Sequence, residues 1–447
     1  SRITGHGLRI TDYAADVGNG RFCENSRMNT QTHFLLPTIG SAGDVHPVIG
    51  LGRGLQARGH HVTITTSAYF EPLVRQMGLD FIAMGTAEAY VQAVEDPLLW
   101  HPTKGFEFIG RNFLLPATRA LYAILQEMDP RQTVVIAPAL AFGARLAQEK
   151  LGMPMISAHL QAAVLRSVYQ PPVTGPLVLP NWLPLSLKRL WFRIMDQAII
   201  DPILLPELNG FRAELGLPPI RRVFHRWMHS TEMVLGLFPD WYAPPQPDWP
   251  PNTQLTGFIH FEREAERPFS ATVHHFLETG DPPILFTPGS AMQHGAQFFQ
   301  AALEACQLLG RRGLFVSAHA EHVPANLPDA ICYAPYLPFS QVLPQTAALV
   351  FHGGVGTMAQ GLAAGVPLLV MPMSHDQPDN ALRLKRLGVG DYLAPQQFTG
   401  TAVARKLERL LSDTAVAANC RTFAPRVNFN QALADACVAI EQFALER

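Results

Sequence analysis

The fold of this chain is decided by one stretch, FHGGVGTMAQ at residues 351–360. The apolar run that leads into it, residues 347–351, predicts a buried strand of a parallel sheet. The residues that follow, 358–364, predict a short helix, which Gly365 ends. The stretch is therefore expected to be a glycine-rich turn from a strand into a helix.

A turn of this kind is suited to binding phosphate. Glycines let the backbone approach a ligand closely, and the start of the helix adds a positive partial charge. His352 and Thr357 add side-chain donors at the same place. A purely structural turn is the alternative, because tight strand-to-helix turns need glycine for steric reasons. The polar run DQPDN at 376–380 follows on the next loop, where a sugar attached to the phosphate would lie, and this spacing favours a diphosphate-sugar site.

The segment 336–380 resembles the nucleotide-sugar signature of inverting GT-B glycosyltransferases in the UDP-glycosyltransferase superfamily. The resemblance runs from about residue 32 to the end of the chain. It implies an α/β fold, the GT-B fold, with two Rossmann-like domains whose parallel sheets face a central cleft. Within that superfamily, three segments resemble the rhamnosyltransferases of rhamnolipid biosynthesis: RWMHS at 226–230, LFP at 237–239 and WYAPPQ at 241–246.

Length and composition exclude several classes of protein. A chain of 447 residues is too long for one ordinary core, so two domains are expected. A net charge of -2 and the lack of a long basic block argue against nucleic acid as a partner. The five cysteines show no paired or metal-like spacing, which predicts reduced thiols in a cytoplasmic protein. No apolar run is long enough to span a bilayer, so membrane contact is expected only as a peripheral contact at the inner face.

The chain is expected to divide into five parts. Residues 1–31 are polar, lack periodicity and contain no apolar segment typical of a signal peptide, and we expect a poorly ordered extension. Residues 32–239 are expected to form the acceptor-binding domain, and residues 253–425 the nucleotide-sugar-binding domain. The linker is expected at 240–252, which contains five prolines and two tryptophans. Residues 426–447 include a helical pattern that crosses back onto the first domain in resembling proteins.

Both domains are expected to open with strand–helix–strand units. In the first, residues 33–38 predict a strand, 40–46 a loop, and Pro47 the start of a helix that ends at Arg58. In the second, residues 284–287 predict a strand and 296–309 a helix. Such units imply parallel sheets with right-handed crossovers.

The resemblance implies a set of residues that bind the sugar-nucleotide donor. Tyr336 stands where the family stacks the nucleobase, and Leu337 follows it with backbone groups. Asp376 and Gln377 match the pair that binds the sugar hydroxyls, with a polar loop facing water as the alternative. The diphosphate contacts match Gly289, Ser290, His352, Gly354, Gly356 and Thr357. The chain has no Asp-x-Asp pair to hold Mg²⁺ on a sugar nucleotide, so protein donors are expected in place of a metal, and no cofactor is expected.

Gln360 departs from the superfamily pattern. Many members that use a UDP-sugar have a glutamate there, which accepts hydrogen bonds from both ribose hydroxyls. A neutral glutamine accepts less well, and it costs less when one hydroxyl is absent. Because a thymidine diphosphate sugar lacks the 2′-hydroxyl, Gln360 favours a dTDP donor.

Asp44 is expected to be the catalytic base. By register with the family's loop, it stands where many members have a histidine and some bacterial members an aspartate. An aspartate is an adequate base only if its pKa is raised, which an apolar pocket would do. Two alternatives stay open: Asp44 as a turn residue before the helix, and His46 as the base. The carboxylate that often orients a family histidine would fall near Ala137 or Pro138, neither of which can serve, and this favours the aspartate.

Aromatic and aliphatic residues are frequent in the segments between the predicted strands of the first domain. Ligands bind at the carboxyl edge of a parallel sheet, so apolar loops there predict a greasy acceptor pocket. Phe106, Phe108, Phe113 and Trp182 are expected to contact the acceptor. A role in the core is the alternative for part of this group.

Together these residues predict an inverting, metal-independent glycosyltransferase. The expected reaction moves L-rhamnose from dTDP-L-rhamnose onto the hydroxyl of an amphipathic lipid such as a 3-(3-hydroxyalkanoyloxy)alkanoate. The next alternative is transfer from UDP-glucose to a sterol, carotenoid or polyketide. A GT-B-shaped sugar-nucleotide epimerase would have little use for a greasy pocket, and intact Asp44, His352, Asp376 and Gln377 argue against a non-catalytic activator of another transferase. The sequence leaves the oligomeric state open.

Overall fold

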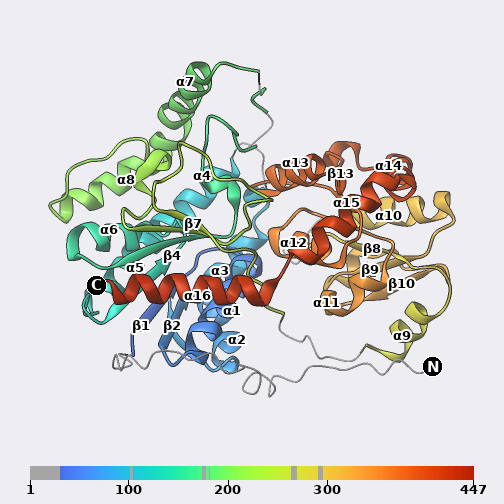
Figure 1. Ribbon diagram of the computed structural model, residues 1–447, viewed down its shortest axis with the longest axis horizontal. Coiled ribbons are helices and arrows are strands. Elements are labelled where there is room, and N and C mark those ends of the chain that lie inside the picture. Colours follow the sequence, from blue (N-terminus) through green and yellow to red (C-terminus); the bar gives the residue numbers. More distant parts are fainter. Residues whose placement is uncertain (1–30, 101–103, 174–177, 181, 263–268, 290–294) are drawn as a thin grey trace, which may run out of the picture. The chain divides into compact units, whose positions relative to one another are not determined.

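The computed structural model describes residues 31–100, 104–173, 178–180, 182–262, 269–289 and 295–447. Residues 32–447 form one compact unit, whose described part contains two parallel β-sheets with helices around them (Figure 1). The expected α/β fold with two parallel sheets is confirmed. The expected extension lies, apart from its last residue, outside the described residues.

The first sheet has seven strands in the order β3-β2-β1-β4-β5-β6-β7, and its strands pair in parallel. They are β1 (His33–Pro37), β2 (His61–Thr66), β3 (Asp80–Ala83), β4 (Thr133–Ala137), β5 (Met155–His159), β6 (Met233–Gly236) and β7 (Thr253–Leu255). Every residue of β4 is buried, as expected for a strand covered on both faces. The strand order reverses between β1 and β4, and a ligand crevice forms at such a switch point.

The second sheet has six strands in the order β10-β9-β8-β11-β12-β13, again paired in parallel. They are β8 (Ile284–Thr287), β9 (Gly313–Val316), β10 (Ile331–Ala334), β11 (Ala348–Phe351), β12 (Leu368–Val370) and β13 (Gly390–Tyr392). Its order reverses between β8 and β11. The glycine-rich turn that follows β11 therefore lies at the second switch point.

Helices connect the strands of both sheets. Those before β7 are α1 (Ala42–Ala57), α2 (Glu71–Gln76), α3 (Ala87–Glu95), α4 (Gly105–Ile109), α5 (Leu115–Gln126), α6 (Phe142–Leu151), α7 (Leu185–Met195) and α8 (Asp201–Glu214). Those after it are α9 (Ala271–Glu278), α10 (Ala296–Leu309), α11 (Phe339–Val342), α12 (Val355–Ala364), α13 (Gln377–Leu387), α14 (Gly400–Ser412), α15 (Thr414–Phe423) and α16 (Phe429–Leu445). The predicted strand 284–287 and helix 296–309 are confirmed as β8 and α10.

Helix α1 starts earlier than the sequence predicted. It begins at Ala42, and Pro47 lies inside it, so the expected loop at 40–46 is wrong. The Ser41 side chain accepts a hydrogen bond from the Gly43 amide, and the Asp44 carboxylate accepts one from the Ser41 amide. This reciprocal capping satisfies amides that a helix start leaves without partners, and it stabilises a turn before the proline. Asp44 therefore lies on the first turn of a helix.

The Pro-rich segment 240–252 does not connect the two sheets. It joins β6 to β7, and β7 pairs with β6 in the first sheet, so the domain boundary expected at 253 is wrong. Proline and tryptophan suit a packed loop as well as a linker, and here Tyr242, Ala243 and Trp249 are buried. The chain passes to the second sheet only after Leu255.

The C-terminal helix α16 packs on the first sheet's side of the molecule, beside α1 (Figure 1). Cys437 and Ile440 share a buried core with Leu55. Arg58 of α1's C-terminal cap donates two hydrogen bonds of 2.7 Å to the Glu441 carboxylate. The expectation that the C-terminal helix returns to the first domain is confirmed.

No helix in the described part of the chain is long and apolar enough to cross a membrane. Four cysteines there are buried and free: Cys306, Cys332, Cys420 and Cys437. Cys23 lies outside the described residues.

Candidate active site

Asp44 lies at the ligand-binding edge of the first sheet. It is on the first turn of α1, the helix that follows β1 at the switch point. The Ser41 amide donates to its Oδ2 at 2.9 Å, and Gln161 Nε2 donates to its Oδ1 at 3.0 Å. The Ser41 hydroxyl also donates to Oδ2, at 3.4 Å, so Oδ1, with one donor, keeps a lone pair for a further hydrogen.

Asp44 lines a pocket whose walls are otherwise almost entirely apolar. The pocket is small, with a volume of about 40 Å³, and it opens to solvent. It lies at the ends of β1, β4 and β5 and is lined by Leu36, Pro37, Thr38, Ile39, Asp44, Val48, Leu51, Ile136, Pro138, Ala158, Leu160, Gln161 and Leu237. Such a lining suits the apolar part of an acceptor.

Burial at this place raises the pKa of the Asp44 carboxyl above its ordinary value. Removal from water disfavours the carboxylate, whereas the hydrogen bonds from Ser41 and Gln161 act in the opposite direction. A carboxylate with a raised pKa is a stronger base. Asp44 therefore has the property that catalysis by an aspartate requires.

The structure does not place His46 in this pocket. The His46 ring packs edge-on against Phe261, with 5.7 Å between the ring centroids, and it is absent from the pocket lining. Although His46 is two residues from Asp44, successive helix positions point in different directions. This arrangement favours Asp44 over His46 as the base.

The aromatic residues expected to bind the acceptor lie apart from the Asp44 pocket. Phe106 packs on the core of the first domain and meets Phe224 edge-on, while Phe108 contacts Phe113. Trp182 is 81% exposed. None of the four lines the pocket, which strand ends and α1 form instead. An apolar pocket does lie next to Asp44. Its walls are formed by aliphatic residues that were not predicted from the sequence.

The glycine-rich turn holds the imidazole of His352 between two glycines. A Cβ at Gly289 would lie 2.6 Å from His352 Cε1, and a Cβ at Gly354 would lie 2.4 Å from Nε2. Gly289 also has a φ of +92°, in the region that favours glycine. Both positions need glycine so that His352 can occupy the turn.

His352 is uncharged at neutral pH, because burial lowers its pKa to about 4. Its Nδ1 is buried and has no hydrogen-bond partner among the described residues. Leaving a buried polar atom without a partner costs free energy, so such atoms are rare in native proteins. A ligand oxygen in the turn would supply the missing partner.

Helix α12 starts directly after this turn, with Gly354 at its N-terminal cap. Beside Gly356 there is open space, since an added Cβ would meet no atom within 4 Å. Gln360 donates weakly to the Gly356 carbonyl at 3.4 Å, and its Oε1 is buried without a partner. Thr357 lies half-buried on the first turn, and Ser290 lies outside the described residues. Amides at a helix start beside open space are suited to a diphosphate.

Tyr336 and Leu337 follow β10 on the second sheet. The Tyr336 side chain is 40% exposed, so its ring retains surface on which a nucleobase can stack. Leu337 is buried in the core, which leaves its backbone groups for a ligand.

Asp376 and Gln377 lie at the start of α13. Asn380 Nδ2 donates to Asp376 Oδ2 at 2.8 Å. The pKa of Asp376 is raised to about 7, first by burial and then by the negative charge of Asp44. Gln377 Oε1 accepts the Met373 amide at 2.8 Å, which leaves its amide nitrogen for a sugar hydroxyl.

His375, directly before Asp376, has a left-handed backbone with a φ of +60°. This conformation is uncommon outside glycine and costs about 1–3 kcal/mol, and such strain concentrates at functional sites. Nearby, Ser374 Oγ is buried without a partner among the described residues. The turn before α13 is thus strained at His375. It also contains the Ser374 hydroxyl, to which a ligand could hydrogen-bond.

Sequence reasoning missed two residues that orient the carboxylates. Gln161, which holds Asp44, stands two positions after the end of β5. A polar residue just beyond a buried parallel strand is a signal that could have found it. Asn380, which holds Asp376, was quoted in the DQPDN run but given no role.

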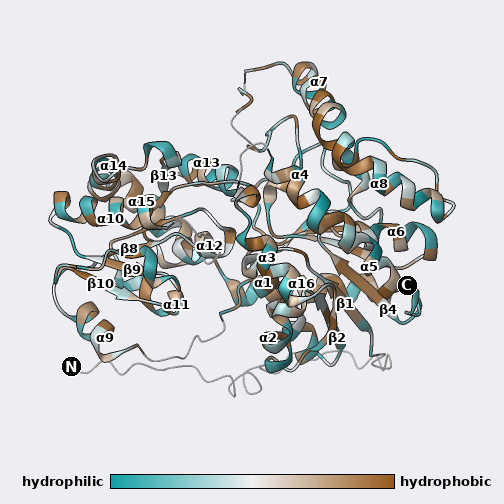
Figure 2. Cartoon of the chain, turned by 180° about the vertical axis from the view of Figure 1, so that it is seen from behind, coloured by the Kyte–Doolittle hydropathy of each residue, from teal (hydrophilic) through white to brown (hydrophobic). Residues whose placement is uncertain are grey.

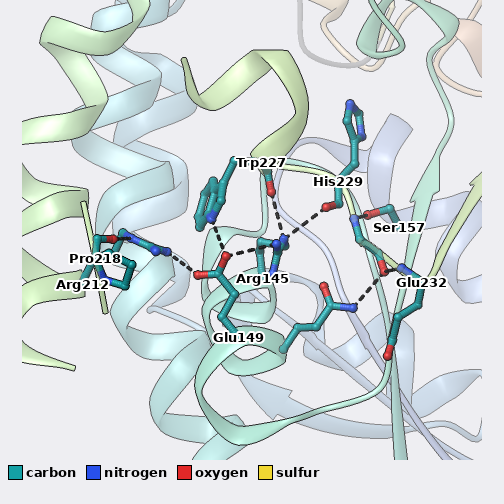
Figure 3. A network of polar contacts seen from close by, with 10 residues as sticks. Arg145, Glu149, Ser157, Arg212, Pro218, Trp227, His229 and Glu232 are labelled. Carbon is teal, nitrogen blue, oxygen red and sulfur yellow. Dashed lines mark hydrogen bonds and ion pairs between the residues drawn. The ribbon is translucent and has the colours of Figure 1, made fainter. Parts of the chain in front are cut away.

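The segment RWMHS at 226–230, one of those that resemble rhamnosyltransferases, makes structural contacts. Arg145 Nε donates to the carbonyls of Trp227 at 3.0 Å and His229 at 3.2 Å (Figure 3). Glu149 pairs with Arg145 at 3.1 Å and accepts from Trp227 Nε1 at 3.0 Å. These bonds fix the segment to α6, so its residues serve the fold.

Two family models match different parts of the chain. "Glycosyltransferase family 28 N-terminal domain" matches residues 34–170, and "Erythromycin biosynthesis protein CIII-like, C-terminal domain" matches residues 314–436. Glycosyltransferase GtfE of Amycolatopsis orientalis is 30% identical over 80% of this chain and 84% of its own length. The chain belongs to the GT-B glycosyltransferases.

Further comparisons agree with this family. O-mycaminosyltylonolide 6-deoxyallosyltransferase of Streptomyces fradiae is 29% identical to this glycosyltransferase over 92% of the chain and 97% of the relative. The solved glycosyltransferase of kitacinnamycin shares the fold with a TM-score of 0.72 at 21% identity, covering 93% of this chain and 99% of its own. As a GT-B glycosyltransferase, the chain is an enzyme that transfers a sugar from a nucleotide-sugar donor to an acceptor.

Proposed function

We propose that this glycosyltransferase transfers L-rhamnose from dTDP-L-rhamnose to a hydroxyl of an amphipathic lipid such as a 3-(3-hydroxyalkanoyloxy)alkanoate, with inversion and without a metal or other cofactor. One observation carries the proposal: the Asp44 carboxylate lines a mostly apolar pocket and is held there by hydrogen bonds from Ser41 and Gln161. In this proposal one apolar part of the acceptor enters the pocket and the hydroxyl reaches Asp44.

The proposed reaction is a single displacement. Asp44 takes the proton of the acceptor hydroxyl while the hydroxyl oxygen forms a bond to the anomeric carbon. The bond from that carbon to the diphosphate breaks at the same time, with its electrons going to the nucleoside diphosphate. Attack from the side opposite the leaving group inverts the configuration. The raised pKa of Asp44 favours its acceptance of the proton.

Protein donors are proposed to stabilise the leaving diphosphate. Its negative charge grows as the bond breaks, and the amides at the start of α12 present positive partial charge. The uncharged His352 adds a ring N–H at the same place. Donors already fixed in position need little rearrangement during the reaction.

Gln360 supports thymidine diphosphate as the nucleotide. Its unpartnered Oε1 can accept one ribose hydroxyl, and a deoxyribose presents one hydroxyl fewer than a ribose. The Streptomyces fradiae relative is named for transfer of a 6-deoxy sugar, as L-rhamnose also is. A spinosyn rhamnosyltransferase of the same fold was solved with thymidine diphosphate.

Transfer of glucose from UDP-glucose to a sterol or polyketide is the second candidate. The names of two relatives favour it, a sterol 3-beta-glucosyltransferase of Arabidopsis thaliana and a vancomycin aglycone glucosyltransferase of Amycolatopsis orientalis. An aliphatic pocket can also receive a rigid ring system.

The test incubates the pure protein with dTDP-L-rhamnose or UDP-glucose, together with a hydroxyalkanoyloxyalkanoate, a sterol or a tylonolide-type polyketide. Nucleotide release and product mass are measured, and Asp44→Asn serves as the control. We expect release only with dTDP-L-rhamnose and the lipid, and a loss of at least about a hundredfold in Asp44→Asn. Turnover of UDP-glucose with a ring-system acceptor would establish the second candidate. Full activity of Asp44→Asn would move the base elsewhere.

We also propose that α7 makes peripheral contact with an anionic lipid bilayer, from which a lipid acceptor would enter. Leu187, Leu190 and Ile194 are exposed on α7 at helical spacing, next to the exposed Arg189 and Arg193. Hydrophobic and hydrophilic residues alternate around this helix (Figure 2). Residues 150–195 contain no Asp or Glu. An apolar stripe with cations and no acids complements a negatively charged lipid surface.

A further inference from the structure

We propose that Tyr242, Asp379, Asn380 and Arg383 are positioning residues, which hold the loop 165–173 and the donor-binding Asp376 in one fixed arrangement. We call these four residues the α13 cluster, because three of them belong to that helix. The inference rests on the proposed function and on the sugar-binding role that the resemblance implies for Asp376. It extends the active site to residues that need not touch either substrate.

Asn380 joins the sugar site to the Pro-rich segment 240–252. Its Nδ2 donates to Asp376 Oδ2 at 2.8 Å and to the Gly353 carbonyl at 2.9 Å. Its Oδ1 accepts the Tyr242 hydroxyl at 2.6 Å. Because Asn380 is fully buried, water does not compete for these bonds. The Tyr242 hydroxyl thus fixes the amide orientation in which Nδ2 faces Asp376.

Asp379 joins the loop 165–173 to the same helix turn. Its Oδ1 accepts the Val173 amide at 3.1 Å, and its Oδ2 accepts Arg383 Nε at 2.6 Å. Arg383 also donates to the Gln170 side chain and to the Tyr242 carbonyl, each at 3.4 Å. The loop is therefore held at two points by one buried ion pair.

The same loop leads back to the proposed base. Gln161, which donates to Asp44, is followed by the short helix η5 (Ala162–Val164) and then by the loop 165–173. Side-chain hydrogen bonds and one short loop therefore connect Asp44 to Asp376 through the α13 cluster.

A contact that only stabilised the fold would be built more simply from apolar side chains. The Asp379 and Arg383 side chains are 2% and 5% exposed, and a buried ion pair contributes little net stability compared with apolar residues of the same shape. Directional bonds do fix relative position, which matters where two substrates must meet in reacting geometry. The polar character of the α13 cluster therefore points to positioning.

The test compares Tyr242→Phe with Tyr122→Phe, a matched variant whose ring is buried in the core of the first domain. Binding of dTDP and of dTDP-L-rhamnose is measured by titration calorimetry, with the unfolding temperature of each protein. We expect Tyr242→Phe to weaken dTDP-L-rhamnose about tenfold and to leave dTDP within about twofold, because the partner implied for Asp376 is the sugar and not the diphosphate. Tyr122→Phe should leave both affinities unchanged.

Equal weakening of dTDP and dTDP-L-rhamnose, or equal effects of the two variants on the sugar nucleotide, would overturn the inference. Failure of the proposed function gives a different result. If the parent protein binds UDP-glucose and not dTDP-L-rhamnose, the donor assignment is wrong, and the same comparison with UDP and UDP-glucose still decides the role of Tyr242.

Asp379→Asn tests the acceptor side of the α13 cluster. Asparagine keeps an oxygen for the Val173 amide but removes the charge that faces Arg383. We expect the acceptor KM to rise about fivefold while dTDP affinity stays unchanged. Gln170→Ala, which removes one weaker contact with Arg383, should change the acceptor KM in the same direction by a smaller factor. An unchanged acceptor KM in both variants would remove the loop from the inference.

Discussion

At the scale of a single residue, Asp44 both caps helix α1 and is the proposed catalytic base. Its Oδ2 caps α1 through the Ser41 amide, and its Oδ1 is held by Gln161. These bonds lower its pKa, burial raises it, and burial is the larger effect. The capping alternative raised from the sequence is therefore compatible with a catalytic role, because the same bonds that start the helix aim the carboxylate at the pocket.

His352→Ala should lower kcat and raise the donor KM, since the imidazole fills the turn between Gly289 and Gly354. Loss of one preorganised donor costs about 3 kcal/mol of transition-state stabilisation, so kcat/KM should fall at least about a hundredfold. His274→Ala, at an exposed position on α9, is the matched control and should keep full activity. EDTA should change nothing. Loss of activity in EDTA that Mg²⁺ restores would contradict the metal-free proposal.

Asp376→Asn should stabilise the ligand-free protein at alkaline pH. The folded-state pKa of about 7 lies above the ordinary value of 3.8, so the folded protein keeps a proton that the unfolded chain releases. The stability contributed by this group is complete below pH 3.8 and is lost as the pH rises through 7. Thermal unfolding should therefore give the variant a higher Tm than the parent at pH 8 and a smaller difference at pH 5. The same Tm difference at both pH values would mean that Asp376 is not buried in this way.

At the scale of elements, α16 shows how a terminal segment can belong to a distant core. Its sequence carries the apolar spacing of an amphipathic helix, but its buried face lies against α1 and not against the sheet that precedes it in the chain. The bidentate pair of Arg58 and Glu441 holds the two helices in register. Removal of apolar contacts in α16 should therefore destabilise the first domain.

Ile440→Ala should lower the free energy of unfolding by about 2–5 kcal/mol, because the side chain is 0% exposed in the core shared with α1. Val438→Ala, on the same helix at 39% exposure, should change it by less than about 0.5 kcal/mol. Denaturant unfolding of both variants measures the difference. Equal stability of the two would show that α16 does not pack on the first core in solution.

At the scale of the whole molecule, the exposed stripe of α7 is set apart by charge as well as by hydropathy. Other exposed hydrophobic residues, such as Leu308 on α10, have an acidic residue nearby in the chain, in this case Glu304. For α7 the nearest acidic residue in the chain is Asp196, which is buried and paired with Arg166 and Arg222. The exposed stripe therefore has no exposed acidic residue close to it in the chain, which suits contact with an anionic membrane.

The protein should sediment with vesicles that contain phosphatidylglycerol and not with vesicles of phosphatidylcholine alone, and binding should weaken as salt is raised. Replacement of both Leu187 and Leu190 by Ser should reduce the bound fraction several-fold. Leu308→Ser, the control at an exposed leucine of α10, should bind as the parent does. Self-association that the α7 variant abolishes, without vesicle binding, would assign the stripe to a contact between two copies of the chain.

The sequence by itself determined some of the elements and the glycine-rich turn, although not the start of α1. The strand 284–287 and the helix 296–309 lie where the local pattern predicted them, because a short apolar run and a helical spacing of apolar residues can both be read from near neighbours in the chain. The turn after β11 was predictable for a similar reason, since its glycines are required by contacts with the adjacent His352 and by a positive φ.

Only the tertiary structure decided how these parts meet. Asp44 and Gln161 are 117 residues apart, and Tyr242 and Asn380 are 138 apart, yet each pair is joined by one hydrogen bond. Likewise, β7 joins the first sheet although the prolines before it looked like a linker. No period in a sequence specifies such pairs, because they depend on how separate surfaces pack and on which buried polar atoms must then find a partner.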